Sequence, residues 1–311
     1  MKKTSVGLAC MAVLFSSGFG AVAQVVFFDD FQQFTNGANL TLTNYTPASG
    51  PAGAVVTTSI ENGSPTCIAS NFLGSTMAFF DNSAVPNKGQ YRGSLSQIQT
   101  NQVLMASWKL WIQATNSGPG YFLFSIPVSD PNADFNPPVF FTDSGSVAAL
   151  TNGNTSQTSI GEWGSLAGTI MTNRLVLNFP NRAFSFSING QILAVLPLGS
   201  YFSNRVNAVY FNPLERSSAS LGNRFALDDI KVELLPITPT ITAINKTGTN
   251  ALVRFTTLPG GRYSVETRDD LRGGTWTTLT NNITGTGDTL QVFDGGISGA
   301  TSRFYRVVKT F

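Results

Sequence analysis

The chain has 311 residues, of which 12% are charged and 42% hydrophobic, and its formal net charge is +2. The apolar content excludes a disordered chain, and the length allows two domains that each have a core. The small and evenly spread charge lacks the basic stripe that tracks phosphates, so nucleic acid is excluded as a partner.

The N-terminus has the pattern of a signal peptide. Lys2 and Lys3 precede a short apolar run, and Ala21-Val22-Ala23 forms a small-x-small cleavage site. We therefore expect residues 1–23 to be removed on export. The apolar run is too short for a transmembrane helix. The sequence thus predicts a secreted or periplasmic protein that lacks a transmembrane segment.

Removal of this peptide takes Cys10 with it and leaves Cys67 as the one thiol of the mature chain. A single thiol cannot form an internal disulfide, and the chain has no His to activate it. Free Cys is among the most buried residue types, so Cys67 is expected in the core.

The mature chain alternates apolar and polar residues with period two between dense turn signals, which is typical of β-strands. In the clearest hairpin, residues 183–188 and 191–195 flank Asn189-Gly190, a pair that suits a type I′ turn. Five further strands are expected before residue 236: Val103–Ala114, Tyr121–Pro127, Arg174–Phe179, Val206–Phe211 and Phe225–Leu234. The spacing predicts an antiparallel β-sandwich and no βαβ units.

Two prolines in the segment 236–239 mark a domain boundary, because proline cannot donate to a sheet ladder. The segment is predicted to be a linker between a first domain, 24–235, and a second domain, 240–311. The second domain has its own strand pattern: Thr240–Asn245, Ala251–Thr257, Arg262–Thr267, Thr275–Leu279, Thr289–Asp294 and Arg303–Val308. Its length suits a smaller immunoglobulin-like sandwich.

Several short motifs resemble known families. The opening FFDDF (27–31), the hairpin FSFSINGQILAVLPL (184–198) and the closing ALDDIKV (226–232) resemble concanavalin A-like, LamG-type jelly rolls of secreted bacterial proteins. The motifs RYSVETRDDLRGGTWTTLT (262–280) and SRFYRVV (302–308) resemble fibronectin type III-like modules at the end of such proteins. The resemblance implies a jelly roll, then a fibronectin type III-like module, and sugar or surface binding.

Four carboxylates bracket the first domain: Asp29 and Asp30 at its start, and Asp228 and Asp229 at its end. If the first and last strands lie side by side, all four come together. The sequence therefore offers a candidate metal site there, with structural Ca²⁺ as the ion, because calcium takes six to eight oxygen ligands.

Strict alternation places Asp228 on one face with Ile230 and Val232, unless a bulge intervenes, and Asp29 likewise falls among phenylalanines. A carboxylate beside core residues is unfavourable unless it is paired or bound to a metal. The alternative to calcium is that these carboxylates accept backbone N–H bonds or pair with an arginine such as Arg224.

Alternation along 106–113 assigns Trp108 to the core and places Lys109, Trp111 and Gln113 on the other face. A tryptophan among polar neighbours is how sheets stack sugar rings, so these three residues are the candidate ligand-binding site. The alternative is that a loop covers Trp111. In the second domain, Trp276 is expected to fill the core.

The absence of His excludes Ser-His-Asp and Cys-His nucleophiles and His-ligated zinc. The E-x-D-x-(x)-E signature of laminarinase-type jelly rolls is also missing, although a hydrolase that uses Glu162 or Asp143 stays possible as a third reading. The main prediction is an exported, non-catalytic protein that binds a polysaccharide or cell-surface glycan. The alternative is a structural or adhesive envelope protein with protein partners. The oligomeric state has no signal in the sequence.

Overall fold

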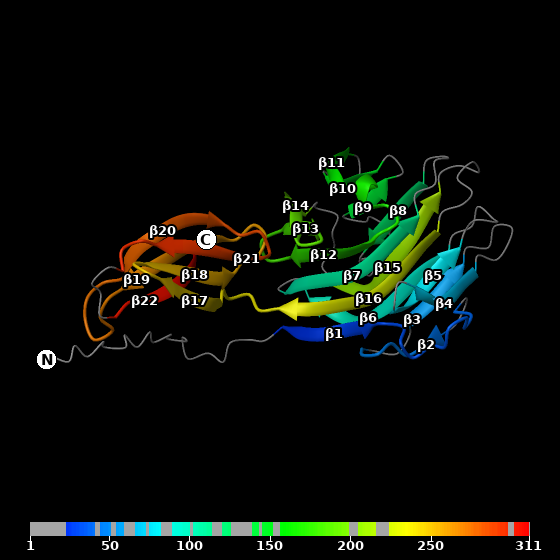
Figure 1. Cartoon of the computed structure of the whole chain (residues 1–311), viewed down its shortest axis with the longest axis horizontal. Coiled ribbons are helices and arrows are strands. Elements are labelled where there is room, and N and C mark those ends of the chain that lie inside the picture. Colours follow the sequence, from blue (N-terminus) through cyan, green and yellow to red (C-terminus); the bar gives the residue numbers. More distant parts are fainter. Residues whose placement is uncertain are drawn as a thin grey trace, which may run out of the picture. The chain divides into compact units, whose positions relative to one another are not determined.

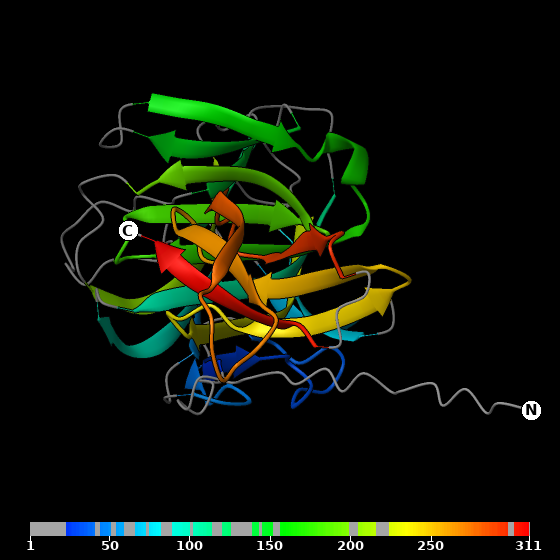
Figure 2. The same cartoon turned by 90° about the vertical axis from the view of Figure 1, so that its left-hand side faces the viewer.

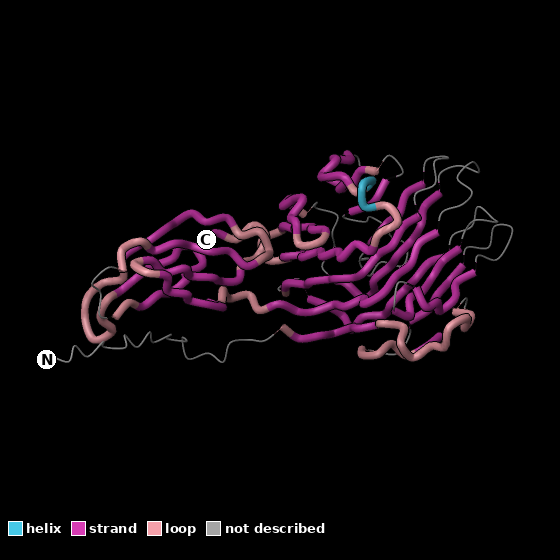
Figure 3. Tube along the Cα trace, in the orientation of Figure 1, coloured by secondary structure: helices cyan, strands magenta, loops and turns pink. Residues whose placement is uncertain are grey.

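The computed structural model describes residues 23–40, 44–50, 54–58, 66–72, 75–81, 89–99, 102–113, 120–125, 139–142, 145–151, 156–198, 205–215, 224–297 and 302–310. In this part of the chain β-strands dominate, and the 3-10 turn Gly164–Leu166 is the one helical segment (Figures 1 and 3). Every described strand pairing is antiparallel. The predicted all-β antiparallel fold class is confirmed.

The chain divides into two compact units, Ala23–Leu235 and a second unit that comprises Pro236–Phe311. The division falls at the start of the proline-containing segment 236–239. The predicted signal peptide, apart from Ala23, lies outside the described residues. Among those that are described, no helix is long and apolar enough to cross a membrane.

The first unit has two sheets of eight strands, and we call the first of them sheet A. Its strand order is β14-β13-β12-β7-β16-β5-β4, and β1 pairs with β16 beside β5. Its strands are β1 (Gln24–Asp29), β4 (Thr66–Phe72), β5 (Ser75–Asp81), β7 (Val103–Gln113), β12 (Ile170–Asn178), β13 (Ala183–Ile188), β14 (Gln191–Pro197) and β16 (Arg224–Leu235).

The second sheet of this unit, sheet B, has the order β11-β10-β9-β8-β15-β6-β3-β2. Its strands are β2 (Asn44–Tyr45), β3 (Ala54–Thr58), β6 (Gly89–Gln99), β8 (Gly120–Ser125), β9 (Val139–Thr142), β10 (Ser146–Thr151), β11 (Ser156–Glu162) and β15 (Arg205–Glu215). The five strands predicted before residue 236 correspond to β7, β8, β12, β15 and β16.

One apolar core fills the space between sheets A and B, which makes the first unit a β-sandwich. Trp108 of sheet A meets Phe211 of sheet B edge to face, with 5.6 Å between the ring centroids. A Cβ at Gly93 of β6 would lie 2.6 Å from the ring of Phe27 in β1, so this close approach of the sheets requires glycine. Cys67 is buried in the same core, as predicted.

The predicted hairpin is confirmed in detail. Strands β13 and β14 pair with each other on either side of Asn189 and Gly190. These two residues have φ of +50° and +80°, as a type I′ turn requires. The Asn189 side chain also accepts a hydrogen bond from the backbone N of Thr172, at 2.9 Å, which ties the turn to β12.

The second unit is a smaller sandwich of two three-stranded sheets (Figure 2, yellow to red strands). Sheet C has the order β17-β18-β21, and sheet D has the order β20-β19-β22. The strands are β17 (Ile241–Thr247), β18 (Asn250–Thr256), β19 (Arg262–Arg268), β20 (Thr277–Thr284), β21 (Thr289–Asp294) and β22 (Phe304–Thr310). Buried apolar residues from both sheets form its core.

Candidate functional site

The predicted adjacency of the opening and closing strands is confirmed, because β1 pairs with β16 from Gln24 opposite Leu234 to Asp29 opposite Ile230. On the same side, β16 pairs with β5 only up to Leu227. The closing strand thus changes partner at Asp228 and Asp229, where β1 ends and β5 begins.

A bulge marks this change of partner. Asp228 lies opposite Lys109 of β7, and Lys231 lies opposite Ser107, so two residues of β16 face one residue of β7. Asp229 has a φ of +48°, in the left-handed region where Asp is one of the tolerated residue types. The bulge residues are thus Asp229 and Ile230, and Asp228 is the last paired residue before them.

Asp29 lies between the sheets of the first unit and has no exposed surface. Its Oδ2 accepts hydrogen bonds from the hydroxyls of Tyr91 at 2.7 Å and Tyr45 at 2.8 Å, both from sheet B. Its Oδ1 accepts the backbone N–H of Phe31 at 3.4 Å. Burial raises the pKa of Asp29, and these hydrogen bonds oppose the rise. The carboxyl group thus links the two sheets.

Asp228 lies on the opposite, outer face of sheet A. Its Oδ2 accepts a hydrogen bond from Ser75 Oγ at 2.8 Å, and its Oδ1 accepts the backbone N–H of Asp229 at 2.9 Å. The expectation that alternation places Asp228 on the core face is wrong, because the bulge shifts the alternation. Asp228 is still only 1% exposed. Burial, helped by the charge of Asp229, raises the pKa of Asp228 to about 6.

The remaining acidic residues of this junction are more exposed. Asp229 pairs with Lys109, with 2.5 Å between Oδ2 and Nζ, and the two side chains are 41% and 38% exposed. Asp30 accepts the backbone N–H of Gln32 at 3.2 Å. The Gln32 side chain in turn donates to Ser75 Oγ at 3.1 Å, which joins the end of β1 to the start of β5.

These positions do not combine Asp29, Asp30, Asp228 and Asp229 into one metal site. Asp29 points between the sheets toward two tyrosines, whereas Asp228 and Asp229 lie on the outer face. Among the described residues, no group of three or more His, Cys, Asp or Glu side chains is placed to hold a metal ion. The expectation of a single calcium site built from all four carboxylates is therefore corrected. The sequence did not indicate that Tyr45, Tyr91, Gln32 and Ser75 form hydrogen bonds at this junction, because they belong to no recognisable motif.

Lys109, Trp111 and Gln113 share the outer face of sheet A, whereas Trp108 lies in the core, as alternation predicted. Trp111 is nevertheless only 9% exposed. Its ring packs in an apolar cluster with side chains from three neighbouring strands: Met77 and Phe79 of β5, Ile170 of β12 and Ala226 of β16. The expectation of an exposed stacking ring at Trp111 is wrong, because neighbouring strands supply large apolar side chains beside it.

Trp276 also departs from expectation. It lies outside the buried clusters of the second unit and is half-buried. The guanidinium of Arg306 lies 4.6 Å from the centre of its ring, and that of Arg268 lies 5.9 Å away. Both distances are within the range of cation–π attraction. Trp276 is therefore part of a surface group on sheet D, and the core is filled by Tyr263, Phe255 and their neighbours.

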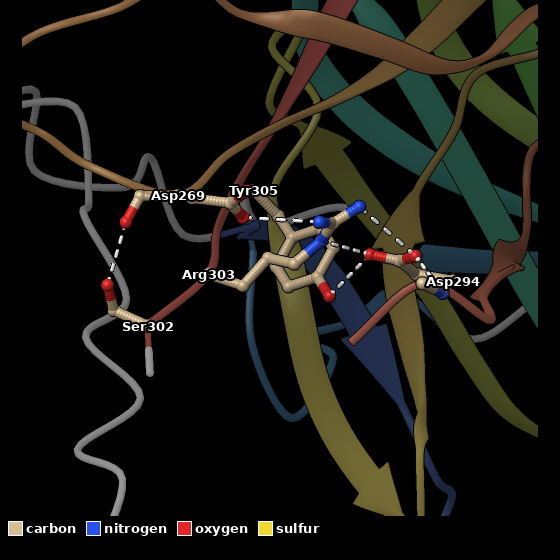
Figure 4. Close-up of polar contacts among 6 residues, drawn as sticks. Asp269, Asp294, Ser302, Arg303 and Tyr305 are labelled. Atoms are coloured by element: carbon tan, nitrogen blue, oxygen red, sulfur yellow. Dashed lines mark hydrogen bonds and ion pairs between the residues drawn. The ribbon is translucent and has the colours of Figure 1, made fainter. Parts of the chain in front are cut away.

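A second polar cluster joins the ends of three strands in the second unit (Figure 4). Arg303 donates from Nε to Asp294 Oδ2 at 2.5 Å, and from Nη1 to Asp269 Oδ1 at 3.1 Å. Tyr305 donates its hydroxyl to Asp294 Oδ2 at 2.9 Å. Asp294 is buried, so this arrangement satisfies a carboxylate that would otherwise be unfavourable there. The cluster therefore joins sheets C and D through buried polar contacts.

Of the two residues considered for hydrolysis, the structure describes Glu162. Glu162 ends β11, is exposed, and accepts a hydrogen bond from Ser146 Oγ at 3.3 Å. Asp143 lies outside the described residues.

No protein-family model matches the chain, and a search of curated proteins found no match. Among solved structures, the chain is similar to a sialidase with a TM-score of 0.43 and 10% identity, over 63% of this chain and 18% of the sialidase. It is similar to the botulinum neurotoxin serotype D binding domain with a TM-score of 0.44 and 11% identity, over 86% and 71% of the two chains.

A third similar structure is the Bacillus licheniformis β-glucanase, with a TM-score of 0.42 and 10% identity, over 68% of this chain and 98% of the glucanase. These scores and identities are too low to carry an argument about family, ligand or activity. The alignment with the sialidase, moreover, spans less than a fifth of that protein.

Proposed function

We propose that the protein is exported and binds a glycan or cell-surface polymer without catalysing a reaction. The observation that carries the proposal is the half-buried Trp276 on the outer face of sheet D, beside Arg268 and Arg306. Ligand sites combine aromatic surface with a few placed polar donors, and this group of residues has both. The candidate site thus moves from Trp111 in the first unit to Trp276 in the second.

Two features support the rest of this proposal. The signal-peptide pattern at residues 1–23 supports export. The buried carboxylates Asp29, Asp228 and Asp294 each accept hydrogen bonds from fixed internal partners, which favours structural over catalytic use. A carboxyl group held in this way is poorly placed to exchange protons with a bound sugar.

The two units suit the families that the motifs resemble. The two eight-stranded antiparallel sheets support a LamG-type jelly roll for the first unit. The two three-stranded sheets of the second unit support a fibronectin type III-like module. In that unit the Tyr263 hydroxyl accepts the backbone N–H of Leu258 at 2.9 Å, a tyrosine-to-backbone link of the kind that immunoglobulin-like sandwiches use at a strand corner.

A structural or adhesive protein of the cell envelope is the second candidate function. The burial of Trp111 favours this second function, because a buried ring cannot stack on a sugar. Phe293 on the outer face of sheet C, at 66% exposure, adds apolar surface that a protein partner would cover.

A glycan array probed with the secreted chain, residues 24–311, separates the two functions. Binding to a defined set of glycans that is lost in Trp276→Ala supports the proposal, provided that the variant still unfolds cooperatively above the temperature of the assay. Absence of binding to every glycan, together with recovery of envelope proteins by cross-linking, favours the structural function.

A further inference from the structure

We propose that the outer face of sheet D binds an acidic polysaccharide, whose carboxylates or sulfates pair with Arg268 and Arg306 beside Trp276 and with Arg262 farther along β19. This inference rests on the proposed function and names the chemical class of its ligand. It follows from the charge of the second unit, the side chains that share this face and the donors that they present.

The small net charge of the whole chain hides an uneven distribution between the two units. Residues 236–311 contain eight Lys and Arg against five Asp and Glu, a formal charge of +3. Residues 24–235 contain nine basic against twelve acidic residues, a formal charge of −3. The charge is therefore not evenly spread, and the second unit attracts anions.

Alternation in β19 sends Tyr263 and Val265 into the core, so the neighbouring charged residues of that strand point outward. Glu266 pairs in register with Arg306 of β22, and Arg268 pairs with Phe304. On the described strands of sheet D, this outer face carries three guanidinium groups (Arg262, Arg268 and Arg306) and one carboxylate, that of Glu266. Exposed threonines of β20 lie beside them: Thr278, Thr280 and Thr284.

The guanidinium groups are held in place and still have donors to offer. An arginine has five N–H donors. Arg306 uses Nε for Glu266 Oε2 at 2.6 Å, and Arg262 uses Nη1 for Thr284 Oγ1 at 2.5 Å. Arg268 donates from Nε and Nη2 to the backbone carbonyls of residues 273 and 271. In these contacts each group therefore keeps at least three N–H donors for an anion.

The chemistry of this face favours a polysaccharide over other polyanions. Guanidinium forks match carboxylate and sulfate oxygens in pairs, which a uronate or sulfated sugar presents at regular intervals. The ring of Trp276 adds aromatic surface, and the threonine hydroxyls offer hydrogen bonds to sugar hydroxyls. An open sheet face accommodates an extended polymer, whereas a small molecule needs a concave site.

The test measures binding of the secreted chain to immobilised polygalacturonate, chondroitin sulfate, neutral dextran and duplex DNA. We expect binding to one or both acidic glycans, none to dextran, and at least tenfold weaker affinity in about 0.5 M NaCl, because salt screens surface charges. Uronate and sulfate are separated by comparing the first two ligands. Equal affinity for DNA overturns the inference, since the face would then bind any polyanion.

Charge-reversal variants locate the site. Arg262→Glu and Arg306→Glu are expected to weaken binding at least tenfold. The control is Arg254→Glu, an equal change of charge at an exposed residue of β18 in sheet C, which should leave the affinity within about twofold. Arg306→Glu also removes the ion pair with Glu266 and could therefore misfold. Arg262→Glu breaks no ion pair, so a loss of binding in that variant reports on the ligand contact. Equal loss in all three variants overturns the assignment to sheet D.

Failure of this inference can be told from failure of the proposed function. Binding to neutral glycans alone overturns the acidic ligand class and leaves glycan binding intact. Absence of binding to any glycan, in a chain that melts cooperatively, overturns both.

Discussion

The Tyr91 hydroxyl donates a hydrogen bond to Asp29 Oδ2 at 2.7 Å, although β6 and β1 belong to different sheets. Both side chains are fully buried. Tyr45 donates to the same oxygen from the edge strand β2. A polar link therefore crosses the apolar core of the first unit beside the point where β16 changes partner.

Tyr91→Phe should destabilise the first unit by about 1–3 kcal/mol, because it leaves a buried carboxyl group with one donor fewer. Urea unfolding of residues 24–311, followed by tryptophan fluorescence, measures the effect. Tyr45→Phe is the matched control and should cost less, since Tyr45 is only half-buried. A Tyr91→Phe variant as stable as the parent would show that Asp29 does not depend on this bond.

Asp228→Asn should change the pH dependence of stability. The pKa of Asp228 is raised to about 6 in the folded protein, from 3.8 for a free side chain. The folded state then binds the proton more tightly, so the stabilisation from protonated Asp228 is complete below pH 3.8 and is lost as the pH rises through 6.

Melting temperatures of the parent chain should therefore fall relative to those of Asp228→Asn between about pH 4 and pH 6, and the difference should be constant above pH 7. Parallel curves across this range would contradict a raised pKa at Asp228. Asp229→Asn removes the neighbouring charge that helps to raise this pKa, so the fall in melting temperature should move to a lower pH.

Trp111→Ala should lower the free energy of unfolding by about 3–5 kcal/mol, because the ring packs against Met77, Ala226 and Phe79. Trp108→Ala, which removes a ring from the main core of the first unit, is the reference for a fully buried tryptophan. If Trp111→Ala were nearly as stable as the parent while Trp108→Ala were strongly destabilised, the Trp111 ring would be exposed and could stack on a sugar.

Trp276→Ala should cost only about 1–2 kcal/mol, since it removes two cation–π contacts at the surface and no core packing. Thermal unfolding of residues 24–311 measures this difference in stability. A loss of the size that Trp108→Ala causes would instead support the earlier expectation that Trp276 fills the core of the second unit.

The fragment 240–311 should fold alone and melt cooperatively, because its two sheets enclose their own apolar core and are joined by the polar contacts of Asp294 with Arg303. Within it, Asp294→Ala should cost about 3–5 kcal/mol, since it leaves the largely buried Arg303 without its main partner. Asp269→Ala, on the exposed side of the same arginine, should cost less. A fragment without a cooperative transition would refute the domain boundary.

The sequence by itself determined β7, β8, β12 to β16 and the strands of the second unit, the type I′ hairpin, the adjacency of β1 and β16, and the opposite faces of Trp108 and Trp111. It did not indicate β2 to β6 or β9 to β11. The strands, the hairpin and the two faces follow from alternation and turn chemistry, which are local properties of the chain, whereas the adjacency of β1 and β16 followed from the matching acidic motifs at the two ends of the first domain. Three decisions needed the tertiary structure: the bulge that moves Asp228 off the core face, the cover over Trp111, and the outward position of Trp276. Each depends on side chains from strands distant in sequence, and a pattern read along one strand does not contain them.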